Sequence, residues 1–249
     1  MARQKSIFRL KGNLGGVSFY KSKDGFLARE ESAIDADRIF KDPSFQRTRE
    51  NMAEFSDAAK SGGLLRSALR PQLMRTADGR VASRLTRKMM EILKTDMESP
   101  RGERRVALGT PQLLEGFDFN IKAPMSSTLY ALYAAQINRA GEDASIHFPS
   151  FIPDEGVTMP EGSTHFKLIS SCAIIDFEGR DYEASFQESA LIPLNSPATE
   201  IIDLQHTLSA GSVLPMFLTL GVLFYQQVNG VAYSLRNGVY NALSIVKVG

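Results

Sequence analysis

The chain has 249 residues, of which 43% are hydrophobic and 23% are charged, a composition typical of globular proteins and unlike that of disordered or fibrous chains. Its formal net charge of +1 argues against an overall electrostatic attraction to nucleic acids or membranes. The one cysteine, Cys172, cannot form an intramolecular disulfide. No segment has the apolar core of a signal peptide or the roughly 20 apolar residues of a membrane span. We therefore expect a cytoplasmic protein, or one in a particle assembled there, without a membrane partner.

The first segment, residues 1–32, is predicted to form a β-hairpin arm. Short apolar runs alternate with glycine turns: residues 7–10 and 17–20 flank Gly15-Gly16, and Asp24-Gly25 precedes Phe26. Glycine supplies the positive φ that tight hairpin turns require. Because an isolated hairpin is marginally stable in water, this arm must pack on its own chain or pair with another molecule.

Residues 33–105 change to helical periodicity, which defines a predicted helical segment at 33–110. Asp42-Pro43 is a helix start signal, and Ser61-Gly62-Gly63 is expected to break or kink the helix that follows. A further helix is predicted to open at Asp78-Gly79 and to end near Ser99-Pro100. Its apolar side holds Val81, Leu85, Met89, Ile92 and Leu93, and its opposite side holds Arg80, Arg84, Arg87 and Lys88.

From about residue 112 the apolar pattern alternates, which predicts an antiparallel β domain over residues 111–249. Strands are predicted near 116–121, 128–138, 144–148, 164–177, 181–191, 199–207, 213–228, 231–235 and 239–248. Residues 178–181, 229–230 and 237–238 are predicted hairpin turns. The predicted fold class is α+β: an N-terminal β-hairpin, a helical segment, then an antiparallel β-sandwich-like C-terminal domain.

Four segments resemble a family of uncharacterised Bacteroidota proteins. They are GNLGGVSFYKSKDGFLARE (12–30), DPSFQRTRENMAEF (42–55), VNGV (228–231) and YNAL (240–243). The resemblance spans most of the chain. It implies a bacterial protein without a signal peptide. It implies no activity, cofactor or catalytic residue.

No pattern of catalytic or cofactor-binding residues stands out. Phosphate-loop and dinucleotide-binding motifs are absent, and the three histidines lack the paired spacing of zinc ligands. A Ser-His-Asp triad could be formed by Ser163, His165 and Asp176, but the G-x-S-x-G sequence of a nucleophile elbow is absent. The sequence thus predicts no enzyme activity, cofactor or metal. An unrecognised enzyme site in the proline-rich loop at residues 149–162 stays open as a third hypothesis.

The charge is divided unevenly along the chain, and this division leads to the first functional hypothesis. Residues 1–110 carry 23 Lys and Arg against 14 Asp and Glu, a net +9, whereas residues 111–249 carry 6 against 14, a net −8. A basic face on one copy meeting an acidic face on the next would give a head-to-tail contact. We therefore expect a structural subunit that self-assembles into a homo-oligomeric tube, shell or phage-like particle.

The alternative is a nucleic-acid-associated protein that binds through its basic helical face. The candidate assembly residues are Ile7, Phe8, Leu10, Phe19, Tyr20, Arg80, Arg84, Arg87 and Lys88.

Overall fold

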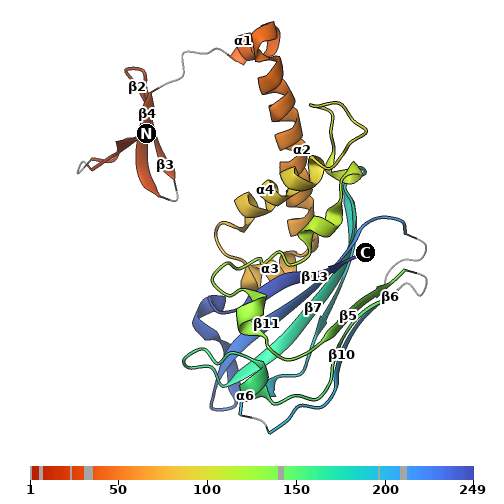
Figure 1. The fold of residues 1–249 in the computed structure, drawn as a ribbon. Coiled ribbons are helices and arrows are strands. Elements are labelled where there is room, and N and C mark those ends of the chain that lie inside the picture. The colour runs from red at the N-terminus through yellow and green to blue at the C-terminus, as the bar shows by residue number, and fades with distance from the viewer. Residues whose placement is uncertain are drawn as a thin grey trace. The chain divides into compact units, whose positions relative to one another are not determined.

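A computed structural model describes residues 2–5, 8–22, 24–30, 36–139, 143–195, 197–207 and 212–249. Strands come first, helices follow, and antiparallel sheets complete the chain, which confirms the predicted α+β class (Figure 1). The chain forms two compact units, residues 1–51 and residues 52–249. The predicted borders at residues 32 and 110 divide the chain by type of secondary structure, whereas packing places residues 52–110 and 111–249 in one unit.

The first unit contains an antiparallel sheet in the order β1-β4-β3-β2. Its strands are β1 (Ala2–Arg3), β2 (Gly12–Leu14), β3 (Val17–Ser22) and β4 (Gly25–Glu30). The turn between β2 and β3 uses Gly15 and Gly16, whose φ angles of 58° and 78° fit a tight hairpin. The predicted hairpin therefore forms as part of a larger sheet. The short helices α1 (Ala36–Lys41) and η1 (Pro43–Phe45) follow it.

The register of this sheet separates its side chains into two unlike faces. Phe19 lies opposite Ala28, and Tyr20 lies opposite Leu27, so Phe19 and Tyr20 point to opposite sides. The face that includes Phe19 is mostly apolar: Ala2, Leu14, Val17, Phe19, Phe26 and Ala28, with Lys21 and Glu30. We call this the apolar sheet face. The other face is more polar and carries Arg3, Asn13, Ser18, Tyr20, Leu27 and Arg29.

The long helix α2 (Gln46–Ala68) starts where the sequence predicts it. Asp42 accepts a hydrogen bond from the Ser44 amide at 2.9 Å, and Pro43 occupies the first turn of η1. The expected break at Ser61-Gly62-Gly63 is wrong, because α2 runs through it without interruption. Gly62 instead lies against α4 (Val81–Leu93), where a Cβ atom would meet Leu85 Cγ at 3.5 Å. Close helix packing therefore outweighs the low helix propensity of glycine.

Two further helices complete the helical layer. α3 (Arg70–Thr76) takes Pro71 in its first turn, and α4 (Val81–Leu93) ends earlier than the predicted Ser99-Pro100. The apolar stripe predicted for α4 is buried as expected, since Val81, Leu85, Met89, Ile92 and Leu93 all belong to the core.

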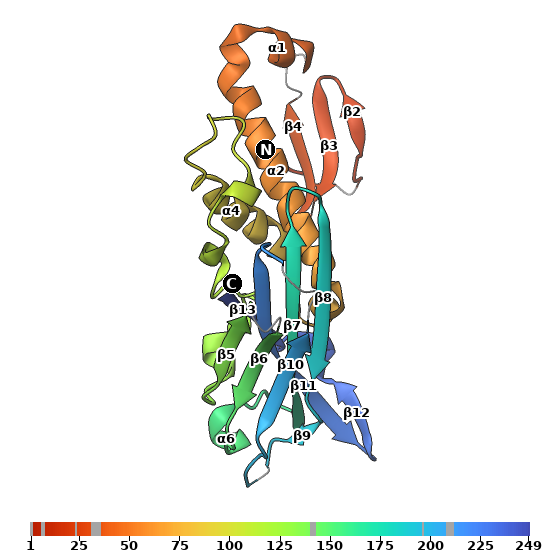
Figure 2. The ribbon, with the colours of Figure 1, turned by 90° about the vertical axis from the view of Figure 1, so that its right-hand side faces the viewer.

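The second unit is built on two antiparallel sheets that curl into a half-barrel. The larger sheet contains β7 (His165–Asp176), β8 (Asp181–Glu188), β9 (Ile192–Pro193), β11 (Met216–Val228), β12 (Val231–Ser234) and β13 (Ala242–Val248). The smaller has the order β10-β6-β5, with β5 (Ala134–Asn138), β6 (Asp143–Phe148) and β10 (Ile202–Thr207). Helices α2, α3 and α4 lie on one side of the larger sheet, and the smaller sheet lies on the other (Figure 1; Figure 2).

The larger sheet is buried on both faces. Along β7, Leu168 and Cys172 face the core shared with the smaller sheet, whereas Ile169, Ala173 and Ile175 face the core shared with the helices. The sequence of a strand that is buried on both faces is a nearly continuous apolar run. This explains why residues 168–175 and 216–224 are almost uniformly apolar or small.

Several predicted β elements differ in the structure. Residues 116–121 form no strand, but Gly116 and Phe119 donate backbone hydrogen bonds to Ile245 and Leu243 along the edge of β13, both at 2.8 Å. The strand predicted at 128–138 begins only at Ala134, and the turn predicted at 237–238 is part of the short helix η4 (Leu235–Gly238). The connecting segments hold the short helices η2 (Val106–Leu108), η3 (Pro111–Leu114), α5 (Met125–Thr128) and α6 (Pro153–Gly156).

Candidate functional site

The N-terminal residues predicted for assembly do not form one cluster. Ile7 lies outside the described residues. Phe8 and Leu10 precede β2 and are exposed, with Phe8 at 79%. Phe19 lies on the apolar sheet face and Tyr20 on the opposite face, where the Arg29 guanidinium lies over its ring at 5.7 Å. Phe19 is the predicted residue that lies on the apolar sheet face, where it is half-buried.

The basic residues of α4 make contacts within their own chain. Arg84 forms an ion pair with Asp78 at 2.6 Å and donates to the Asp118 carbonyl oxygen at 2.7 Å. Lys88 pairs with Glu91 at 2.9 Å, and Arg87 lies 3.8 Å from the same carboxylate. Arg80 is exposed at the N-terminal end of the helix. Arg84 therefore has a structural role, and the positive face of α4 is weaker than the sequence alone indicates.

Ion pairs also join the basic and acidic parts of the chain inside one subunit. Arg75 pairs with Glu188 on β8, and Arg105 pairs with Glu178 at 3.0 Å. Part of the opposite charge that motivated the head-to-tail hypothesis is therefore neutralised within the subunit.

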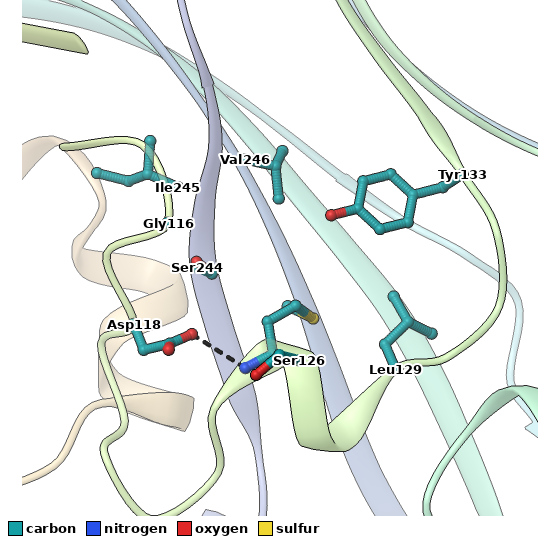
Figure 3. A pocket seen from close by; sticks show the side chains of 9 residues that line it. Gly116, Asp118, Ser126, Leu129, Tyr133, Ser244, Ile245 and Val246 are labelled. Atoms are coloured by element: carbon teal, nitrogen blue, oxygen red, sulfur yellow. Dashed lines mark hydrogen bonds between the residues drawn. The ribbon is translucent and has the colours of Figure 1, made fainter. Parts of the chain in front are cut away.

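A cavity of about 310 Å³ opens beside β13, between the 116–118 segment, α5 and Tyr133. Figure 3 shows Asp118 and Tyr133 on opposite sides of this cavity, with the Tyr133 hydroxyl pointing inward. Apolar side chains form much of the remaining wall, together with two serines. The lining residues are Gly116, Asp118, Met125, Ser126, Leu129, Tyr133, Ser244, Ile245 and Val246.

The polar groups of this cavity are only partly satisfied by the protein. Asp118 Oδ1 accepts a hydrogen bond from the Met125 amide at 3.0 Å, yet the carboxylate forms no ion pair within the described part of the chain. Burial raises the pKa of Asp118 above its usual range. Burial also raises the pKa of Tyr133, whose hydroxyl has no hydrogen-bond partner among the residues that the structure places.

A second polar cluster lies inside the half-barrel, around His206. Its Nε2 lies 2.8 Å from Ser170 Oγ, and its Nδ1 lies 3.1 Å from Ser185 Oγ. Burial lowers the pKa of His206 to about 4, so the ring is neutral near pH 7. Ser170 and His206 are both buried, so the Ser170 hydroxyl is not accessible to a substrate in solution.

The other sequence candidates for chemistry do not assemble. His165 and Asp176 lie at opposite ends of β7, so no triad forms with Ser163. Burial raises the pKa of Cys172 to about 12, which keeps its thiol protonated and unreactive. In the described ranges, no three His, Cys, Asp or Glu side chains are grouped to hold a metal ion. Nor does any helix in those ranges combine the length and apolar character needed to cross a bilayer.

Sequence reasoning did not find the Asp118 cavity or the His206 cluster. Asp118 lies in a segment predicted to be a strand, and His206 meets Ser170 only because β10 folds over β7. Comparison with protein-family models, with curated proteins and with solved structures finds no significant match. The resemblance to uncharacterised Bacteroidota proteins stays a prediction.

Proposed function

We propose that this protein is a structural subunit that self-assembles into a homo-oligomer through its N-terminal sheet. One observation carries the proposal: the sheet β1-β4-β3-β2 is a single layer with an apolar face, and none of the described residues from 2 to 51 is buried. The first unit therefore brings apolar surface to the protein without a core of its own.

The physical argument rests on how sheets are stabilised. A sheet that is apolar on one side needs a second layer against that side. The apolar sheet face groups Val17, Phe19, Phe26 and Ala28 on two central strands, and all four are half-buried. The Arg9 guanidinium and the Lys21 ammonium lie over the Phe26 ring at 5.0 and 5.8 Å, so the apolar surface lies beside basic groups. A group of partly exposed apolar side chains on one face of a sheet is typical of a protein interaction site.

The partner that fits best is a second copy of the chain. Residues 1–30 carry seven Lys and Arg against two Asp and Glu, whereas residues 111–249 carry a net −8. Electrostatic complementarity of this kind steers association and suppresses wrong partners. A contact between unlike surfaces closes into a ring or propagates as a helix, and a tube, shell or phage-like particle is the proposed product.

The nucleic-acid alternative gains less support. Its Arg84 is held by Asp78 and the Asp118 carbonyl oxygen, and its Lys88 by Glu91. Because these contacts hold two of the four basic groups of this face, we retain self-assembly as the main proposal.

The test compares two neighbouring aromatic residues on opposite faces of one strand. Phe19→Asp places a charge on the apolar sheet face, and Tyr20→Asp places the same charge on the other face. We expect wild type and Tyr20→Asp to elute as oligomers in size-exclusion chromatography with light scattering, and Phe19→Asp to elute as a monomer. Negative-stain microscopy of the wild type should show regular particles.

Three outcomes contradict the proposal. They are a wild type that stays monomeric at high concentration and low salt, loss of assembly in both variants, and assembly that persists in Phe19→Asp. Circular dichroism of each variant checks that the second unit remains folded.

A further inference from the structure

We propose that the cavity beside Asp118 binds a small organic cation, a primary alkylammonium whose nitrogen contacts the Asp118 carboxylate and whose carbon chain lies against Met125, Leu129 and Val246. The inference is independent of self-assembly, because every residue that it uses lies in the second unit.

The charge of the site comes from the Asp118 carboxylate, which forms no ion pair among the described residues. Arg84 donates to the Asp118 backbone carbonyl oxygen at 2.7 Å and attracts the Asp118 carboxylate, but the Arg84 guanidinium is paired with Asp78 at 2.6 Å. No lysine, arginine or histidine is among the described residues that line the cavity. A partly buried carboxylate without a direct ion-pair partner is costly, and a bound cation would reduce that cost.

The carboxylate is held firmly in place by its surroundings. Asp118 forms an isolated β-bridge with Ser244, and its Oδ1 accepts from the Met125 amide at 3.0 Å. The flanking Phe119 amide donates to the Leu243 carbonyl at 2.8 Å. A group fixed in this way needs little reorganisation on binding.

The rest of the cavity fits an amphipathic ligand. Leu129 and Val246 provide apolar contact, while the inward hydroxyl of Tyr133 offers a hydrogen bond to a polar substituent (Figure 3). A volume of about 310 Å³ is at the small end of ligand pockets. The ligand is therefore a compact amine and not a nucleotide or a peptide.

The experiment titrates the full-length protein with n-butylammonium chloride near pH 7 and follows binding by calorimetry and amide chemical shifts. The neutral analogue 1-butanol is titrated in parallel. We expect saturable binding of the amine and at least about tenfold weaker binding of the alcohol. Shifted amides should lie in residues 116–118, α5 and β13.

Two variants and a control separate the site from general charge effects. Asp118→Asn keeps an acceptor for the Met125 amide but removes the charge, and it should weaken amine binding about tenfold or more. Ser126→Trp leaves the carboxylate in place and fills the cavity from its exposed rim, and it should weaken binding to a similar degree. Asp154→Asn removes an exposed carboxylate on α6 and should bind as the wild type does.

The proposal is overturned if the wild type shows no saturable amine binding, if Asp118→Asn binds as well as the wild type, or if Asp154→Asn loses binding equally. Unchanged binding in a folded Ser126→Trp variant would also overturn it, since the cation would then bind outside the cavity.

Discussion

His206 is a buried histidine whose two ring nitrogens both face serine hydroxyls. Its pKa is about 4 in the folded protein and 6.5 in an ordinary environment. Below pH 6.5 the unfolded chain therefore takes up a proton that the folded chain does not. This proton uptake stabilises the unfolded chain, so the free energy of unfolding is at its full value above pH 6.5 and falls as the pH decreases from 6.5 toward 4.

This difference predicts that the free energy of unfolding falls by about 2 kcal/mol between pH 7 and pH 5. Urea unfolding at the two pH values measures the change. His206→Asn should remove most of it, whereas His147→Asn, which replaces a half-exposed histidine paired with Asp203, should leave it in place. If the free energy of unfolding of His206→Asn falls between pH 7 and pH 5 as much as that of the wild type, another group is responsible.

The two polar sites show what a sequence leaves undetermined at the level of single residues. Asp118 and His206 are separated along the chain from the residues that define their environments, namely Ser244 on β13 and Ser170 on β7. Their surroundings depend on strand register and on how the two sheets face each other. Neither property follows from local residue spacing.

At the scale of helices and strands, local signals predicted much of the fold correctly. Capping and periodicity predicted the helix start at Asp42-Pro43, the buried stripe of α4 and the long strands β7, β8 and β11. The errors arose where tertiary packing decides. Gly62 stays helical because α4 packs against it, and residues 116–119 pair with β13 without forming a strand.

The two adjacent glycines of α2 differ in their surroundings, and this difference can be tested. A Cβ at Gly62 would lie 3.5 Å from Leu85 Cγ and 3.6 Å from Met89 Cγ, whereas at Gly63 it would meet only Arg66 Nη2 at 3.9 Å. Gly62→Leu should overpack the α2–α4 contact and lower the free energy of unfolding by about 1–3 kcal/mol.

Gly63→Leu is the matched control at the neighbouring position. It should leave stability unchanged or raise it by up to about 1 kcal/mol, because leucine favours the helix more than glycine does. Chemical denaturation of both variants measures the difference. If both lose stability equally, the contact of Gly62 with α4 does not explain the continuous helix.

At the scale of the whole molecule, the two units contribute unequally to stability. Every described buried residue lies between Glu54 and Val248, inside the second unit. The two hydrophobic clusters on either face of the larger sheet account for this core. Burial of apolar surface is the main favourable term in folding, so the second unit holds the elements needed for a stable domain.

Deletion of residues 1–30 should therefore separate folding from assembly. The shortened chain keeps every described buried residue, so its midpoint of thermal unfolding should stay within a few degrees of that of a dissociated full-length subunit such as Phe19→Asp. It should elute as a monomer, because the apolar sheet face has been removed. Differential scanning calorimetry and light scattering measure the two properties. If the midpoint of thermal unfolding of the shortened protein is much lower than that of the Phe19→Asp subunit, the N-terminal sheet stabilises its own chain. The apolar sheet face is then covered within one molecule. If it still forms particles, assembly uses a surface of the second unit.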